Sequence, residues 1–521
     1  MTLFLKLYWQ KLLLLLVLFA CATRLGNIFA ALDYDEIWTM TYFSTKGIKA
    51  IFTELSLPNN QILNSLFVKG MISLELPLWC IRLHSFAAGI LAVVLMIPIG
   101  IRLGRSRGAG FWSALFLLCY APAAAYSQLA RGYELQLFFL LLYTWGLLFA
   151  GEKKYALYAL CAAGAGGVGA VLTLPTSVVY LGVITLCAFA AHPRMPEKKL
   201  LFLLGTGLVF CGIWYGINLD QFRSGQQFGS VIASHKAFFS FAFTTLDTLI
   251  PLLWCPFLIA GLLLIPHRRG AIIALGILLV LLSALVTRGG PPRVYIPLGA
   301  FAAFICGAGV DRICRKLGKK WFLGAFAALL CCAGGFYFNI KQWTPPDWYA
   351  LFAKGKAQME NTLVIYSGTN GFPVMWNNQP HSLEDNAARI GAPYLEKLLC
   401  FTANSSLNGV DEKFNEAALP LKAKGTPADG GFLYTLEAIS APADGDEVIL
   451  VSCKTDKTVD SVIFKGISQT GRFLRLNIFF EDNSNSEEIS CIRGGIIEKS
   501  SSFNWKELPG TMKLYRITQV I

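Results

Sequence analysis

The sequence predicts a multi-pass α-helical membrane protein that ends in a water-soluble α+β domain. Of its 521 residues, 55% are hydrophobic and 15% are charged, and the mean hydropathy is +0.53. In a soluble domain about a quarter of the residues are charged. Apolar runs of roughly 18 residues or more, the length that a spanning helix needs, recur through the first two thirds of the chain.

Eleven apolar segments are predicted to span the membrane. They are residues 10–31, 78–100, 110–126, 133–150, 155–171, 173–191, 200–217, 247–265, 271–287, 294–310 and 321–339. With a cytoplasmic N-terminus, the inner segments carry 17 Lys and Arg, for example in "RLGRSR" and "DRICRKLGKK". Cytoplasmic loops are enriched in Lys and Arg, so we expect this orientation. Because the number of spans is odd, the chain after about residue 341 is then extracytoplasmic.

The distribution of charge divides the chain into two parts. Residues 1–340 carry 27 Lys and Arg against 11 Asp and Glu, whereas residues 341–521 carry 18 against 21. The positive charge lies between the predicted spans, which indicates membrane topology rather than a nucleic-acid partner. We expect a transmembrane domain over 1–340, with interfacial helices in its first outer loop, residues 33–77. Alternating runs such as "RFLRLNIFFED" predict a β-rich α+β domain over 341–521.

Cysteines and histidines show no pattern typical of a metal site. Eleven of the 14 cysteines lie in or beside apolar segments, and the five histidines are scattered without zinc spacing. Cys400, Cys453 and Cys491 lie in the predicted soluble domain. A Cys453–Cys491 disulfide is one pairing that an oxidising compartment would allow.

The segment "ALDYDEIWTM" (31–40) places three carboxylates directly after the first apolar run. They belong to Asp33, Asp35 and Glu36. Three interpretations stay open: a solvated helix start favoured by the helix dipole, a general base toward an acceptor hydroxyl or amine, and a divalent cation held by Asp33 and Asp35.

Two further segments place arginines at the ends of predicted spans. "YSQLARGYELQLF" contains Arg131 and Glu134 with almost no loop around them, and "TRGGPPRVYIPLGA" adds Arg288, Arg293 and Tyr295. An ionisable residue in this position usually faces a protein cavity, and arginine grips phosphate oxygens with two hydrogen bonds. An arginine that snorkels to the lipid headgroups is the alternative. Arginines and a carboxylate cluster on one membrane side suggest an anionic lipid headgroup beside a base.

The order of these motifs resembles the membrane glycosyltransferases of the GT-C fold. The similarity is strongest to the branch of protein O-mannosyltransferases, which use dolichyl-phosphate-mannose, and lipid A aminoarabinose transferases. It covers roughly residues 1–350 and rests on "DYDE", "LPNNQILNSL", "LWCIRLHSFAAG", "YSQLARGYELQLFF" and "PRVYIPL" in that order. The resemblance implies a transferase that moves a sugar from a polyprenyl-phosphate donor to an extracytoplasmic acceptor, with inversion at the anomeric carbon. That acceptor would be a protein, a lipid or an envelope glycan.

The resemblance also implies roles for individual residues. The catalytic candidates are Asp35 as the general base, Glu36 as the residue that orients the base or the acceptor, and Asp33 as the weakest of the three. The candidates for binding the donor phosphate are Arg131, Arg293 and Tyr295, with Arg82 and Arg288 as weaker ones.

Contacts to the acceptor or the sugar are expected from Asn59, Asn60, Tyr133 and Glu134. Many relatives carry a His-Pro-Pro-like turn after the acidic pair, whereas this chain has "LPNNQILNS". The identity of sugar and acceptor therefore stays open, and the two asparagines are equally typical of a turn.

Such a transfer requires no cofactor. Phosphate is a good leaving group, so one base and several positive side chains suffice, although a divalent cation stays an alternative. Two other functions stay open. One is a transporter or flippase for a lipid-linked sugar, although the chain lacks an internal repeat and a matching pair of Gly/Pro-broken helices. The other is a non-catalytic relative that binds glycolipid. We expect a multi-pass protein of the bacterial plasma (inner) membrane, although an endoplasmic reticulum membrane would give the same charge pattern.

Overall fold

The chain forms two units. The computed structural model describes residues 2–44, 47–55, 60–191, 207, 212–221, 235–264, 267–287 and 290–344, and nine strand segments between 365 and 515. The first unit comprises Met1–Phe29 and Lys46–Thr344, and the second comprises Ala30–Thr45 and Pro345–Ile521. The domain boundary at residue 340 stays a prediction.

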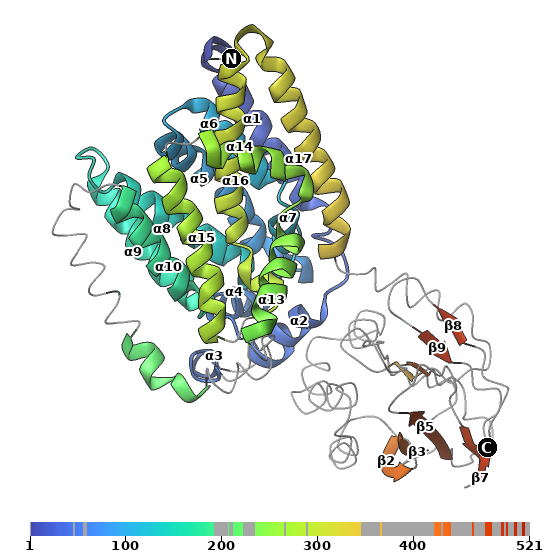
Figure 1. Cartoon of the computed structure of the whole chain (residues 1–521). Helices are drawn as coiled ribbons and strands as arrows, with labels where there is room; N and C mark the ends of the chain where they lie inside the picture. The colour runs from blue at the N-terminus through green and yellow to red at the C-terminus, as the bar shows by residue number, and fades with distance from the viewer. Residues whose placement is uncertain are drawn as a thin grey trace. The chain divides into compact units, whose positions relative to one another are not determined.

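The first unit is built of helices (Figure 1). They are α1 (Thr2–Leu25), α3 (Ile48–Thr53), α4 (Ile62–Ser73), α5 (Leu83–Gly104), α6 (Arg107–Leu118), α7 (Ala121–Tyr126), α8 (Gly132–Phe149), α9 (Ala156–Thr173), α10 (Ser177–Ala191), α13 (His235–Leu249), α14 (Cys255–Leu264), α15 (His267–Thr287), α16 (Leu298–Lys316) and α17 (Trp321–Trp343). The described part of this unit also contains four short 3₁₀ helices: η2 (Leu78–Arg82), η3 (Leu252–Trp254), η4 (Pro292–Tyr295) and η5 (Gly318–Lys320). In Figure 1, α8, α9 and α10 lie side by side, and α16 runs through the middle of the unit.

Several of these helices have the length and composition of membrane spans. Among the described residues five qualify: Leu7–Leu25, Leu78–Gly104, Gly132–Phe149, Ala156–Thr173 and Gly318–Trp343. The pair α13–α14, bent by 81°, would make a sixth if it crosses as one span. The predicted total of eleven spans stays a prediction, because most of 200–217 lies outside the described residues.

The predicted span 110–126 is two helices rather than one. Helix α6 ends at Leu118, and α7 begins at Ala121 with Pro122 in its first turn. Proline lacks the N–H that a helix interior needs but fits the first turn, where that N–H has no helical partner. Because the run is apolar throughout, hydropathy alone did not reveal the break.

Among the described helices, α16 has the largest number of buried residues, and glycine brings its neighbours close. Fourteen of its 19 residues are buried. A Cβ atom at Gly309 would lie 2.5 Å from the carbonyl oxygen of Phe257 near the start of α14, and one at Gly307 would overlap Ser113 of α6. Small residues allow helices in membranes to approach closely and gain van der Waals contact.

The same close approach joins α8 and α9. A Cβ atom at Gly146 would lie 2.6 Å from the carbonyl oxygen of Ala159, and one at Gly166 would lie 2.7 Å from that of Phe139. The neighbouring Gly167 is different, because a Cβ atom there would meet only the ring of Tyr143, at 3.7 Å.

The second unit contains a short helical segment and the described strands. The segment consists of α2 (Tyr34–Trp38) and the π-helix η1 (Thr39–Phe43). The strands are β1 (Ile365–Tyr366), β2 (Leu421–Ala428), β3 (Gly431–Ala438), β4 (Ser461–Val462), β5 (Arg475–Glu481), β6 (Cys491–Arg493), β7 (Ile496–Glu498), β8 (Trp505–Glu507) and β9 (Lys513–Tyr515). Strands β2-β3-β5-β6-β7 form an antiparallel sheet in that order, in which Tyr434 pairs with Ile478. Cys453 lies outside the described residues, so its pairing with Cys491 stays a prediction.

The glycine contact between α8 and α9 yields a stability prediction. Gly166→Ala should lower the free energy of unfolding by about 1–3 kcal/mol, since its methyl group meets backbone atoms that cannot yield. Gly167→Ala is the control and should be neutral or slightly stabilising, because alanine favours a helix more than glycine does. Thermal unfolding in detergent measures both variants, and equal midpoints would contradict the packing described.

Candidate functional site

The acidic segment forms a capped helical turn within the second unit. Asp33 precedes α2 in an extended conformation, and its backbone N–H donates to Oε2 of Glu36 (2.8 Å). This is the reciprocal half of a capping box, which satisfies N–H groups at a helix start. Glu36 is buried, whereas Asp33 and Asp35 are half-buried. The carboxylate of Glu36 therefore holds the turn on which Asp35 stands.

Tyr133 joins two of the predicted phosphate-binding arginines in the helical unit. The guanidinium of Arg131 lies over the Tyr133 ring, 5.6 Å from its centroid, within the range of a cation–π interaction. Nε of Arg293 donates to the Tyr133 hydroxyl (3.0 Å). Residues 160 positions apart in the sequence are thus brought together at the start of α8.

Backbone contacts hold Arg131 at the start of α8. Arg131 is the N-cap residue of this helix and is only 2% exposed. Its carbonyl accepts a hydrogen bond from Oγ of Ser85 (3.0 Å), and the next N–H, of Gly132, donates to Oε1 of Gln61 (2.5 Å). A Cβ atom at Gly132 would lie 2.7 Å from Thr173, so glycine is required for this approach.

Tyr295 lies two residues after Arg293 on η4. It is buried, and its ring packs edge-on against Phe241 with 5.5 Å between centroids. Val294 lies between Arg293 and Tyr295 in the sequence. Its carbonyl accepts a hydrogen bond from the Tyr180 hydroxyl (3.3 Å). Tyr180 thereby links η4 to α10.

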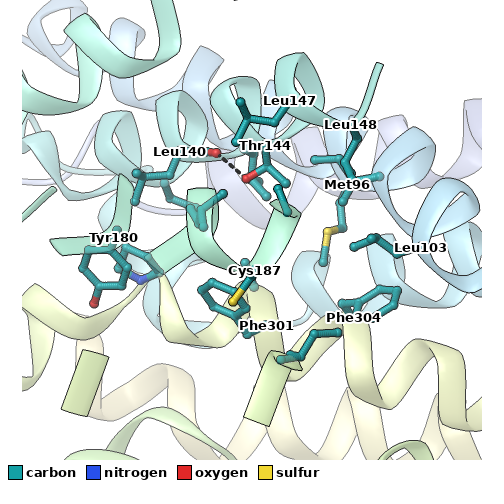
Figure 2. A pocket seen from close by; sticks show the side chains of 18 of the residues that line it. Met96, Leu103, Leu140, Thr144, Leu147, Leu148, Tyr180, Cys187, Phe301 and Phe304 are labelled. Atoms are coloured by element: carbon teal, nitrogen blue, oxygen red, sulfur yellow. Dashed lines mark hydrogen bonds between the residues drawn. The ribbon is translucent and has the colours of Figure 1, made fainter. Parts of the chain in front are cut away.

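An apolar pocket begins at Tyr180 and extends between α5, α8, α10, α15 and α16. Its volume is about 100 Å³. Figure 2 shows Tyr180 on one side, Leu103 and Phe304 on the other, and Cys187 and Phe301 between them. Polar side chains are few among the lining residues and are satisfied, since Thr144 donates to the Leu140 carbonyl (2.7 Å) and Tyr180 to Val294. Pro297 and Ala300, which follow η4 directly, also line it. The pocket therefore suits a hydrocarbon chain.

Three other predicted site residues have contacts within the helical unit. Nη1 of Arg82 donates to the carbonyls of Asn27 and Ile28 (3.0 Å each), and Arg82 is 1% exposed. Nδ2 of Asn60 donates to the carbonyls of Ile51 (2.9 Å) and Glu54 (2.7 Å), as a turn-forming asparagine does. Glu134 is fully buried on the first turn of α8. Roles of these residues toward a ligand stay predictions.

Glu134 has an electrostatic partner, Arg24, that the sequence reasoning missed. Both side chains are fully buried and lie within range of a Coulombic interaction, without a hydrogen bond between them. The two carboxylate oxygens of Glu134 accept no hydrogen bond from any described residue. Arg24 donates through Nη1 to the Thr23 hydroxyl (3.1 Å) and packs against Gly89, where a Cβ atom would lie 2.8 Å from Nε. In the sequence, the one sign of a role for Arg24 is that it is a single charge near the end of the first apolar run.

Two predicted residues, Asn59 and Arg288, lie outside the described residues. Within the part of the chain that the structure describes, no group of three or more His, Cys, Asp and Glu side chains is arranged to hold a metal ion.

The buried pair of Arg24 and Glu134 yields a second stability prediction. Glu134→Leu and Arg24→Leu should each change the free energy of unfolding, because each removes the oppositely charged neighbour of a buried side chain. The change in the double variant should differ from the sum of the two. Glu152→Leu is the control, since the side chains of the pair Arg102–Glu152 (2.7 Å) are 37% and 34% exposed and exposed pairs contribute about 1 kcal/mol or less. Denaturant unfolding in detergent measures all four variants, and additive changes would show that the charges do not interact.

Comparison with known proteins returns structures but no sequence family. No family model matches the chain, and no curated protein matches it. ArnT from Cupriavidus metallidurans bound to undecaprenyl phosphate is 12% identical with a TM-score of 0.45, over 73% of this chain and 88% of that one. Apo ArnT is 14% identical with a TM-score of 0.42, over 78% and 73%. The apo oligosaccharyltransferase of Archaeoglobus fulgidus is 14% identical with a TM-score of 0.41, over 72% and 61%.

These solved structures are GT-C-fold membrane glycosyltransferases, the family that the sequence resembles. Every identity is below 25% and every TM-score is below 0.5. The proposals below therefore rest on this chain's own residues.

Proposed function

We propose that the protein is a membrane glycosyltransferase that moves a sugar from a polyprenyl-phosphate donor to an acceptor. The main support for the proposal is the position of two polar residues beside the apolar pocket. Arg293 and Tyr295 stand on η4, and Pro297 and Ala300, which follow directly, line the apolar pocket. A phosphate group and a hydrocarbon chain on one molecule match this sequence of polar and apolar surface.

In this proposal the donor phosphate is bound by Arg131 and Arg293. Arginine forms charge-assisted, bidentate hydrogen bonds with phosphate, and two guanidinium groups would stabilise the charge that builds up on the departing phosphate. Tyr133 supports both groups by its ring and its hydroxyl. Tyr295 and Arg288 stay further candidates for the same phosphate.

Asp35 acts as the general base in the proposed reaction. Its carboxylate takes the proton of an acceptor hydroxyl or amine, while the acceptor atom forms a bond to the anomeric carbon. The bond between that carbon and the phosphate oxygen breaks, and its electron pair leaves with the polyprenyl phosphate. Attack opposite the leaving group inverts the anomeric carbon. Glu36 holds the turn through the N–H of Asp33, which supports a role in orienting Asp35.

The charge pattern supports the proposed orientation of the protein in its membrane. We propose the plasma membrane, a cytoplasmic N-terminus, and a β-rich domain after residue 341 that lies outside and meets the acceptor. In this orientation the lipid donor reaches the site from within the membrane, and the acceptor reaches it from water.

Turnover of a donor panel tests the proposal. Purified wild-type protein, Asp35→Asn and Asp33→Asn are each incubated with radiolabelled polyprenyl-phosphate sugars and membrane acceptors. Asp35→Asn should bind donor normally but transfer sugar roughly 10²–10⁴-fold more slowly, the usual contribution of a general base. Asp33→Asn is the matched control and should retain most activity.

Each other outcome has a definite meaning. Equal rates for Asp35→Asn and wild type would move the base to Asp33 or Glu36. No transfer by any protein across the panel, with donor still bound, would favour the transporter or the non-catalytic glycolipid-binding relative.

The apolar pocket predicts a dependence on the length of the donor chain. Ala188→Leu fills the pocket on α10 well beyond Tyr180, and Ala300→Leu fills it beside η4. Ala188→Leu should weaken binding of a long polyprenyl phosphate roughly tenfold, because excluding about two methylene groups costs ~1.6 kcal/mol. It should leave binding of geranyl phosphate unchanged, whereas Ala300→Leu should weaken both. Competition binding in detergent measures the four affinities, and equal effects on both ligands would place the chain elsewhere.

A further inference from the structure

The end of α1 is held by side chains from two distant segments. Helix α1 ends at Leu25, and its last carbonyls have no partner within the helix. Asn27 follows two residues later, and its peptide groups are bound on both sides. Its N–H donates to Oε1 of Gln128 (2.6 Å), and its carbonyl accepts from Nη1 of Arg82 (3.0 Å).

Gln128 connects α1 to α7. Besides accepting from Asn27, it donates through Nε2 to the carbonyls of Thr23 (3.3 Å) and Ala124 (2.9 Å). It is 4% exposed, so water does not compete for these bonds. Both ends of one amide are thus used to join the end of α1 to the last turn of α7.

Arg82 makes the matching contact from η2. The same Nη1 atom donates to the carbonyls of Asn27 and Ile28, and the side chain is 1% exposed. Hydrogen bonds from a charged donor are about twice as strong as neutral ones. A guanidinium bound in this way to two consecutive carbonyls fixes their direction.

We infer that Arg82 and Gln128 are positioning residues that clamp the peptide of Asn27 and thereby fix the course of the backbone that directly follows α1. Asp35 stands eight residues after Asn27. This inference rests on the proposed function in one respect, namely that Asp35 is the base. It reassigns Arg82 from the donor phosphate to the backbone.

Hydrogen exchange tests the clamp without any activity measurement. The full chain in detergent is compared with Gln128→Met and Arg82→Met, which keep much of the side-chain volume but lose the hydrogen bonds. The N–H of Asn27 should exchange at least tenfold faster in Gln128→Met, and the segment 26–37 should exchange faster in both variants.

Gln136→Met is the matched control for exchange. Gln136 is also a fully buried glutamine, but it donates to Ser177 (2.9 Å) and Thr176 (3.3 Å), away from α1. Exchange at Asn27 should be unchanged in this variant. Gln128→Glu keeps an oxygen that accepts from Asn27, so it should restore protection of that N–H. Unchanged exchange in Gln128→Met, or equal acceleration in Gln136→Met, would overturn the clamp.

Kinetics then distinguish positioning from phosphate binding. A misplacement of about 1 Å in a catalytic group can cost roughly 100-fold in rate. Arg82→Met should therefore lower kcat by about 10- to 100-fold with an unchanged affinity for polyprenyl phosphate, and Arg82→Lys should recover part of kcat. Weaker polyprenyl phosphate binding with unchanged exchange at 26–37 would return Arg82 to the phosphate site. If wild-type protein transfers no sugar, the proposed function fails, and hydrogen exchange still decides the clamp.

Discussion

The burial of three guanidinium groups is the constraint on which the helical unit depends. Arg24, Arg82 and Arg131 are among the largest fully buried side chains of the described chain. A charge inside a membrane protein is costly unless it is paired, so each group must meet a compensating surface. Arg82 donates hydrogen bonds to two carbonyls, and Arg131 forms a cation–π contact with the ring of Tyr133. Arg24 has a Coulombic interaction with Glu134. These contacts draw α1, η2 and α8 together.

These arginines differ in the kind of partner that they contact. Arg82 donates to two backbone carbonyls, whereas Arg131 contacts the ring of Tyr133 and Arg293 donates to its hydroxyl. Binding of phosphate is the role proposed for Arg131 and Arg293, and arginine suits it because its hydrogen bonds to phosphate are charge-assisted. The carboxylate of Glu36 accepts the N–H of Asp33, which gives Glu36 a structural contact beside Asp35, the proposed base.

The sequence predicted the helices better than the contacts between them. Apolar runs located α5, α8, α9 and α17 because their hydrophobic content is a local property. The break before α7 was missed, since an apolar run gives no sign of where a chain turns. The clamp joins Asn27 to Gln128, 101 residues apart, and such a pairing depends on how helices pack rather than on local pattern. Arg131 and Arg293 were predicted as phosphate-binding residues because charge at the end of a span is conspicuous in one sequence. Their common partner Tyr133 was expected only as a contact to acceptor or sugar.

Tyr133 supports two arginines from different sides, one by its ring face and one by its hydroxyl. A change at any member of this trio alters the surroundings of the other two, so the three positions are subject to joint rather than separate selection. Replacement of the tyrosine by phenylalanine would remove the hydrogen bond to Arg293 and keep the ring contact with Arg131. Among natural relatives, we therefore expect these three positions to vary together, and a sequence that lacks the tyrosine to have a different arrangement of positive charge at the start of α8.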